Sequence, residues 1–267
     1  MADIRSKINE LYALEQLAAG QTALHRLHPL GKLLVTFVYL ICLLSLDSCA
    51  LHRLAPFLFY PILCAALASV PLGMIVRRAV WALPFALLAG LGNVYFSRAP
   101  VLQIGSFTVS AGMLSLAVLL LRTLLSVSAV LILVSVTPFA QLTAQLHRLH
   151  LPEILIALTE MTYRYLGILT EEAVNLLTAF RLRSKGRQWP NLREFAPLAG
   201  QLLLRSADRA ERVYNAMQCR CQSLGRRYVP SPAWRPADGI FLILGAGSAV
   251  LFREWDIMTA IGELFPW

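Results

Sequence analysis

Residues 152–221 read PEILIALTEMTYRYLGILTEEAVNLLTAFRLRSKGRQWPNLREFAPLAGQLLLRSADRAERVYNAMQCRC, and this segment decides how the chain is organised. It carries two long helical patterns, 152–186 and roughly 191–225, joined by a short break at Trp189-Pro190. Each pattern ends in a small basic cluster, in a sequence that otherwise reads as membrane spans. The segment favours a pair of amphipathic helices with basic ends that bind another protein.

The composition identifies the chain as a polytopic membrane protein. Of its 267 residues, 57% are hydrophobic and only 15% are charged, and the mean hydropathy is +0.62. This is too apolar for an ordinary soluble domain. The net charge of +9 does not indicate nucleic acid, because 14 of the 24 Lys and Arg lie between Arg148 and Arg235 among seven acidic residues. Such interleaving is typical of a cytoplasmic region that follows the positive-inside rule.

Five apolar runs predict about five transmembrane helices, within a range of four to six. The runs cover residues 30–46, 54–72, 79–96, 112–136 and 237–252. We interpret Arg77-Arg78 as a cytoplasmic turn between the second and third spans, and residues 104–110 as a short extended loop outside the membrane. With the amino terminus in the cytoplasm, 20 basic residues lie inside and three outside, which supports this topology.

The expected fold class is therefore an all-α membrane protein with two long amphipathic cytoplasmic coupling helices besides its spans. Residues 1–136 would hold an amino-terminal interfacial helix and transmembrane helices one to four. Residues 137–235 would form the coupling-helix region, and residues 236–267 the last transmembrane helix and a tail. Three glycines in the last run (Gly239, Gly245 and Gly247) predict close helix packing.

Two residue pairs have the spacing of metal ligands, but neither predicts a metal site. His147 and His150 lie three apart without an evident third ligand, so we favour interfacial histidines. Cys219 and Cys221 suit a soft cation such as Cu(I), yet no third thiol is near them. The five scattered cysteines give no disulfide framework. We expect this chain to bind no metal and no cofactor.

One arginine lies inside a predicted span. A charge at Arg122 is costly in the bilayer unless it faces the bundle or a carbonyl group. We interpret it as structural, with a place on a transport path as the alternative. For the basic helix ends, the alternative to partner binding is that helix dipoles and topology alone gather cations there.

Residues 210–220, AERVYNAMQCR, resemble the second signature of the transmembrane T component of energy-coupling factor (ECF) transporters. The likeness is greatest to the cobalt/nickel branch, CbiQ. Residues 181–186, RLRSKG, occupy the place of the first signature. Further matching marks are His28-Pro29-Leu30-Gly31-Lys32 before the first span, Thr137-Pro138 after the fourth, and Tyr163-Arg164-Tyr165. The resemblance covers most of residues 24–252.

The resemblance implies a non-catalytic coupling subunit of an ABC-type importer in the bacterial inner membrane. Its two coupling helices would dock into a pair of CbiO-like ABC ATPases, which bind ATP and Mg. A CbiM-like S component, with a small CbiN-like subunit as an additional partner, would bind the cargo. Cobalt or nickel is the expected cargo, and a vitamin is the alternative. Apart from these subunits, the partner is the lipid bilayer and not nucleic acid.

The resemblance also implies which residues dock. The ATPase-docking residues would be Arg183, Ser184, Lys185, Gly186, Cys219, Arg220 and Cys221, supported by Arg212, Tyr214, Ala216, Met217, Glu171 and Glu172. Arg220 matches the second docking arginine. Lys185 replaces the first, which keeps the charge but loses the two-pronged contact, so Arg183 would share that work. The two cysteines replace a small Ala and a Gly around Arg220.

The other function classes are a stand-alone membrane enzyme and a secondary transporter. Glu171-Glu172 invites comparison with a prenyl-protein protease motif, but Leu176 stands where that motif needs arginine. The spans offer no His or Glu for a metal and few ionisable groups for a transport path. The chain has no Walker motif, so it cannot hydrolyse ATP by that route.

Overall fold

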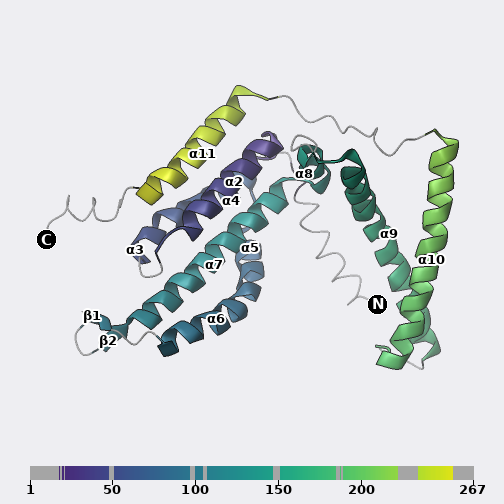
Figure 1. Ribbon diagram of the computed structural model, residues 1–267, viewed down its shortest axis with the longest axis horizontal. Helices are drawn as coiled ribbons and strands as arrows, with labels where there is room; N and C mark the ends of the chain where they lie inside the picture. The colour runs from purple at the N-terminus through teal and green to yellow at the C-terminus, as the bar shows by residue number, and fades with distance from the viewer. Residues whose placement is uncertain are drawn as a thin grey trace. The chain divides into compact units, whose positions relative to one another are not determined.

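The computed structural model describes residues 18, 20, 22–47, 51–96, 100–104, 107–146, 151–184, 187, 189–221 and 234–254. The chain divides into two compact units, whose elements are labelled in Figure 1. The transmembrane unit comprises Ala13–Phe139 and Pro232–Trp267. The second unit comprises Met1–Tyr12 and Ala140–Ser231, and we call it the α8–α10 unit.

The transmembrane unit is helical except for one short hairpin. Its elements are α2 Pro29–Leu44, α3 Leu51–Leu54, η1 Pro56–Leu58, α4 Phe59–Ala68, α5 Leu72–Ala79, η2 Val80–Ala82, α6 Leu83–Phe96, β1 Pro100–Ile104, β2 Phe107–Ser110, α7 Ala111–Val136 and α11 Pro236–Glu254. Strands β1 and β2 pair antiparallel, where the sequence predicted an extended loop.

The predicted class, an all-α membrane protein, is confirmed. Within the described ranges, three helices are long and apolar enough to cross a membrane: Leu72–Gly92, Ala111–Val136 and Pro236–Glu254. Two shorter apolar helices, Pro29–Leu44 and Pro56–Ala68, lie where the first and second spans were predicted. At 16 residues, α2 is about 24 Å long, which is below the usual thickness of the hydrocarbon core.

The boundary between the second and third apolar helices was predicted wrongly. Arg77 and Arg78 lie in the last turn of α5, inside a helical run, and form no turn. The chain turns instead at Ser69, whose φ of 54° is left-handed and whose N–H closes the end of α4. Ile75 is buried while Arg77 is exposed, so an amphipathic helix accommodates both arginines.

Helix α7 forms the centre of the transmembrane unit, since it packs against α2, α4, α5 and α6. Helix α11 covers α2. The Tyr39 hydroxyl donates to the Phe57 carbonyl at 2.9 Å, and its ring stacks on Tyr60 with centroids 4.4 Å apart. Pairing of the hydroxyl and stacking of the rings both stabilise this apolar core.

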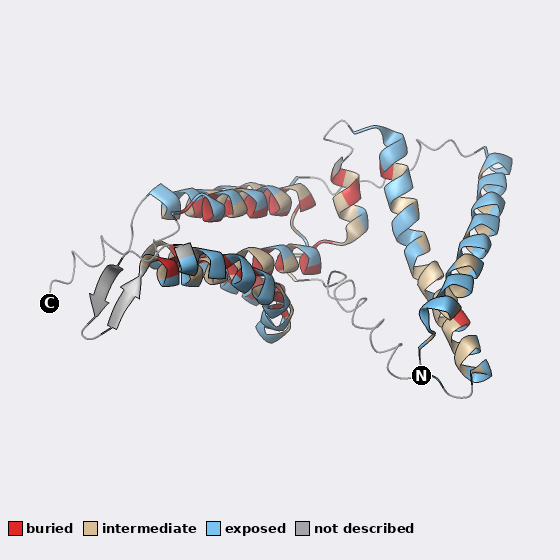
Figure 2. Cartoon of the chain, turned by 60° about the horizontal axis from the view of Figure 1, so that its bottom comes forward, coloured by how far each residue is buried: buried red, intermediate tan, exposed pale blue. Residues whose placement is uncertain are grey.

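Large apolar side chains cover the outside of the transmembrane unit. Trp81, Phe85 and Leu88 are 79%, 77% and 70% exposed on successive turns of the α5–α6 run. Figure 2 shows the exposed and intermediate positions along these helices in pale blue and tan. An apolar surface of this kind suits contact with lipid, not with water.

Arg122 of α7 contacts the carboxy-terminal end of α2. Its guanidinium donates to the carbonyl oxygens of Leu46 at 2.5 Å, Asp47 at 3.4 Å and Leu44 at 3.5 Å. A cation favours a helix carboxy terminus, where carbonyl groups lack helical partners. The contacts support the structural interpretation of Arg122.

Gly245 lets α11 approach α2 closely. A Cβ atom at position 245 would lie 2.6 Å from Cγ1 of Val35, which is fully buried and branched at Cβ. A Cβ atom at Gly239 or Gly247 would have no described heavy atom within 4 Å. Of the three glycines in this helix, Gly245 is the one that this packing requires.

Gly245→Ala is therefore expected to destabilise the chain by about 1–3 kcal/mol, the usual cost of overpacking a core. Gly247→Ala, two residues further along α11, is the matched control. It is expected to be neutral or slightly stabilising, because alanine is the better helix former. Thermal denaturation of the purified protein in detergent measures both. Equal effects of the two substitutions would contradict the assignment.

Candidate functional site

Two long antiparallel helices dominate the α8–α10 unit. Helix α8 spans Phe139–Leu146, α9 spans Glu153–Arg183 and α10 spans Leu192–Cys219. With 31 and 28 residues, α9 and α10 are about 46 and 42 Å long. Both predicted helices are confirmed, although each ends earlier than the sequence pattern. Figure 2 draws them at the right, mostly in pale blue and tan.

The two helices share little buried surface. None of the residues of α10, all of which the structure describes, is buried. Leu198, Leu202, Val213 and Met217, four of the five residues in the predicted apolar stripe, are half-buried, and Ala210 is exposed. Leu203 remains 70% exposed and Tyr214 55% exposed. A helix pair with so much open apolar surface needs a further partner or lipid to cover it.

Glu172 joins the two helices. Its Oε1 accepts a bond from Arg205 Nη1 at 2.8 Å, and its Oε2 accepts one from Arg209 Nη2 at 3.4 Å. Hydrogen bonding from Arg205 lowers the pKa of the Glu172 carboxyl below its ordinary value, against a smaller opposing effect of desolvation. The charges of both arginines act in the same direction. One carboxylate of α9 thus holds two cations of α10.

Because the folded-state pKa of Glu172 is lowered, the bridge contributes stability above the ordinary pKa of about 4.5 and loses it as pH falls further. Glu172→Gln is expected to lower the melting temperature of the purified chain at pH 7. The difference from wild type is expected to shrink below about pH 4.5. Glu171→Gln, on the neighbouring exposed carboxylate, is the control. A difference independent of pH would contradict the bridge.

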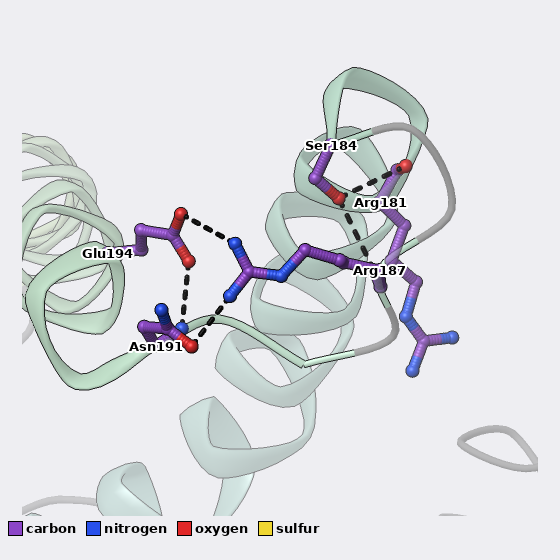
Figure 3. Close-up of polar contacts among 5 residues, drawn as sticks. All are labelled: Arg181, Ser184, Arg187, Asn191 and Glu194. Carbon is purple, nitrogen blue, oxygen red and sulfur yellow. Dashed lines mark hydrogen bonds and ion pairs between the residues drawn. The ribbon is translucent and has the colours of Figure 1, made fainter.

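The connector between α9 and α10 is fastened by polar contacts (Figure 3). Asn191 and Glu194 form a reciprocal capping box at the start of α10. Arg187 donates to Asn191 Oδ1 at 2.6 Å and to Glu194 Oε1 at 3.2 Å. The guanidinium of Arg181 lies 5.9 Å from the centre of the Trp189 ring. These contacts fix where α10 begins.

The first basic helix end lies beside this connector. Arg183 is the last residue of α9 and is exposed, and the N–H of Ser184 closes the helix by donating to Phe180 O at 2.9 Å. The Ser184 hydroxyl contacts the carbonyl oxygens of Arg181 and Arg187. Lys185 and Gly186, the other two predicted docking residues of this end, lie outside the described residues.

The second basic helix end is fully described. Cys219 is the last residue of α10, and Arg220 caps it by donating its N–H to Ala216 O at 3.2 Å. Cys221 has a φ of 51°, the left-handed conformation in which glycine is preferred. Cys219, Arg220 and Cys221 are all exposed, and both thiols are free. The cation of Arg220 is presented to solvent at the helix end.

The structure places the two basic ends far apart. Helices α9 and α10 run antiparallel (Figure 1), so the end of α9, which is Arg183, lies near the start of α10, while Arg220 caps the opposite end of α10. The length of α10 separates them by about 40 Å. Of the predicted supporting residues, Glu172 joins the helices and Met217 is half-buried, while Glu171, Arg212, Tyr214 and Ala216 are exposed. The roles of Arg187, Asn191 and Glu194 were not predicted.

No metal centre is found in the part of the chain that the structure describes. Among those residues, no group of three or more His, Cys, Asp or Glu side chains could hold a metal ion. His147 and His150 lie outside the described residues. The described residues of this unit thus present two exposed cationic helix ends. The ion bridge at Glu172 links the two helices between these ends.

Residues 20–229 match the protein family CbiQ, described as cobalt transport protein. The chain is 34% identical to the cobalt transport protein CbiQ of Salmonella typhimurium over 149 residues, which are 49% of this chain and 66% of that protein. It is 29% identical to a putative fused cobalt transport protein CbiMQ of Methanocorpusculum labreanum over 165 residues, 60% of this chain and 26% of that protein. The chain thus spans less than two thirds of either relative.

A third relative matches over almost the whole chain. The energy-coupling factor transporter transmembrane protein EcfT of Ruminiclostridium cellulolyticum is 22% identical over 260 residues, 91% of this chain and 95% of that protein. This likeness extends through the transmembrane unit and the α8–α10 unit alike.

Proposed function

This chain belongs to the CbiQ family of cobalt transport proteins, and we propose that it is the transmembrane coupling subunit of an ECF-type importer. It transmits the conformational change of an ABC ATPase pair to a substrate-binding S component. The chain catalyses no reaction, and ATP and Mg bind to the ATPases. The names of the relatives support this role, since they are CbiQ, a fused CbiMQ and an ECF transmembrane protein.

The observation that carries the proposal is the separation of two exposed cationic helix ends. An ABC ATPase pair has two equivalent halves, so it offers two equivalent acidic grooves at a distance from each other. Two helix ends about 40 Å apart, each with an arginine, can dock in one groove each. Helix ends that lay side by side would compete for the same groove. The ion bridge at Glu172 lies between the two ends, where it can serve as a pivot.

In this mechanism, nucleotide binding closes the ATPase pair and draws the docked ends of α9 and α10 toward each other. The helices turn about their crossing, and their exposed apolar faces move the S component in the membrane. Substrate enters the cell when the S component reorients. Nucleotide then biases two discrete arrangements of one helix pair, which is the requirement for coupling.

Cobalt or nickel is the proposed cargo. The relatives named cobalt transport protein CbiQ match at higher identity than EcfT, and nickel is included for its similar chemistry. The metal would be bound by a CbiM-like S component, with a CbiN-like subunit as a further partner. A vitamin is the second candidate, supported by the EcfT likeness over 91% of the chain. The positive-inside distribution of basic residues supports the inner membrane with α9 and α10 in the cytoplasm.

Reconstitution of uptake tests the proposal. The chain is expressed alone, with the ATPase pair, and with the ATPase pair and the S component, and uptake of radioactive cobalt is measured. Uptake that needs all the subunits and ATP is expected, and replacing cobalt by nickel or by vitamins identifies the cargo. Uptake by this chain alone would contradict the proposal and favour a secondary transporter.

A further inference from the structure

A cluster of buried polar side chains lies at the start of helix α2. It contacts the segment by which the chain leaves for helices α8–α10 and the segment by which it returns. The chain passes from the transmembrane unit to helices α8–α10 after Phe139 and returns from them at Pro232. The cluster lies within the transmembrane unit. It includes Asp238 and contacts the carbonyl oxygen of Val136, and these two residues are close in sequence to the two points. Its central members are Lys32, from the first turn of α2, and Asp238, from the first turn of α11.

Lys32 holds the outgoing connection. Its side chain is 3% exposed, and its Nζ donates to the carbonyl oxygens of His25 and Val136, each at 3.3 Å. Val136 is the last residue of α7, three residues before the chain leaves the unit. An ammonium group there stabilises carbonyl oxygens that have no helical partner. Lys32 thereby fixes the end of α7 to the start of α2.

Asp238 holds the returning connection. It is 2% exposed, and its two oxygens accept the backbone N–H groups of His28 and Arg235, each at 2.7 Å. The rings of His28 and Trp234 stack beside it with centroids 4.7 Å apart. Asp238 is therefore a bridge between the residue before α2 and the residue before α11. Both segments that connect to α8–α10 are thus bonded to the start of α2, one through the Lys32 side chain and the other through the backbone N–H of His28.

Stability alone does not account for this arrangement. Burying a charged group costs free energy, and apolar residues of similar volume often stabilise a buried position as well. The pair does, however, fix specific backbone atoms, because each charge is matched to named carbonyl or N–H groups. Charged groups at positions 32 and 238 therefore fix the positions of the backbone segments that they bind, whereas apolar side chains there would let those segments shift.

We propose that Lys32 and Asp238 are positioning residues that transmit the movement of α9 and α10 to the transmembrane helices. This rests on the proposed coupling function. The two residues hold both connections to α2, so displacement of either connection moves helix α2. Without them, the ATPases still dock and hydrolyse ATP, but the movement is absorbed in the connections.

The test uses the full complex with the ATPase pair and the S component in proteoliposomes. The measured quantity is the ratio of ATP hydrolysed to cobalt transported, together with the melting temperature. Lys32→Met and Asp238→Asn are expected to raise this ratio about tenfold, within the usual range of coupling energies. Thr36→Val is the matched control. Thr36 is also 3% exposed, and its hydroxyl bonds to Tyr60 and to the backbone carbonyl of Lys32, but to neither connecting segment and not to the Lys32 ammonium. It is expected to lower the melting temperature and leave the ratio unchanged.

The double variant Lys32→Met/Asp238→Asn tests the pairing itself. Either single variant already removes the attraction between the two buried charges, so the double variant is expected to lower the melting temperature by less than the sum of the two single effects. Should Lys32→Met fail to assemble, Lys32→Gln takes its place, since its amide still donates to a carbonyl oxygen.

The proposal is overturned if every assembled variant keeps the wild-type ratio. It is also overturned if Lys32→Gln and Asp238→Asn both fail to assemble while Thr36→Val assembles, because the two residues would then serve folding alone. Failure of the coupling function is distinct, since it appears in the wild-type chain as an inability to retain the ATPase pair.

Discussion

Replacing Arg220 by glutamate is expected to abolish both ATPase binding and cobalt uptake. The structure presents this guanidinium at the exposed end of α10, held by a backbone cap and left without an intramolecular ion pair in the described part of the chain. Reversing a charge that is buried in an acidic groove on docking costs about 2–5 kcal/mol or more. The ATPase pair should therefore be retained at least about 30-fold more weakly.

Two further variants separate charge from geometry at this helix end. Arg220→Lys keeps the cation but loses the planar donor fork, so an intermediate effect is expected. Arg164→Glu makes the same charge reversal on an exposed residue in the middle of α9, and should leave ATPase co-purification unchanged. ATPases that co-purify with Arg220→Glu and still drive uptake would refute the role of Arg220.

The first basic end is expected to tolerate single substitutions better than the second. Arg183 is exposed at the end of α9, and Lys185 follows two residues later in the sequence, so under the proposed docking the two cations would share one site. Lys185→Glu alone is expected to lower uptake about tenfold, because Arg183 would still contribute its charge to the shared contact. The double variant Arg183→Glu/Lys185→Glu is expected to match the loss seen for Arg220→Glu.

Arg187 provides the contrast for that series. It belongs to the same basic cluster, but its side chain is bonded to Asn191 and Glu194 at the start of α10. Arg187→Gln should therefore lower the melting temperature more than it lowers ATPase retention. If Lys185→Glu alone abolished uptake, the sharing of this site by Arg183 and Lys185 would be wrong.

The fold could be predicted from the sequence wherever an apolar run or a helical period was long. The five apolar helices and the α9–α10 pair were predicted in this way. The start of the third apolar helix was predicted wrongly, because Arg77 and Arg78 were interpreted as a turn from their charges alone. The amphipathic pattern that buries Ile75 and Ala79, and the break at Ser69 and Pro71, were the better signals.

The candidate site was predictable only in part. The Asn191-x-x-Glu194 capping box is a local signature that the sequence itself carries. The left-handed conformation of Cys221 could not be predicted from the sequence, because a cysteine carries no local signal for a positive φ. The Lys32–Asp238 cluster could not be predicted, because more than 200 residues separate its members and each is an isolated charge in an apolar run.

Cross-linking from the two native thiols beside Arg220 tests the central claim most directly. Cys219 and Cys221 are free and exposed, and a short bifunctional thiol reagent can join them to a cysteine placed in the acidic groove of the ATPase. A nucleotide-dependent cross-link to the ATPase is expected, and it should be lost in Cys219→Ala/Cys221→Ala and in Arg220→Glu. Thiols that stay unlinked to the ATPase in a complex that still transports cobalt would contradict the account.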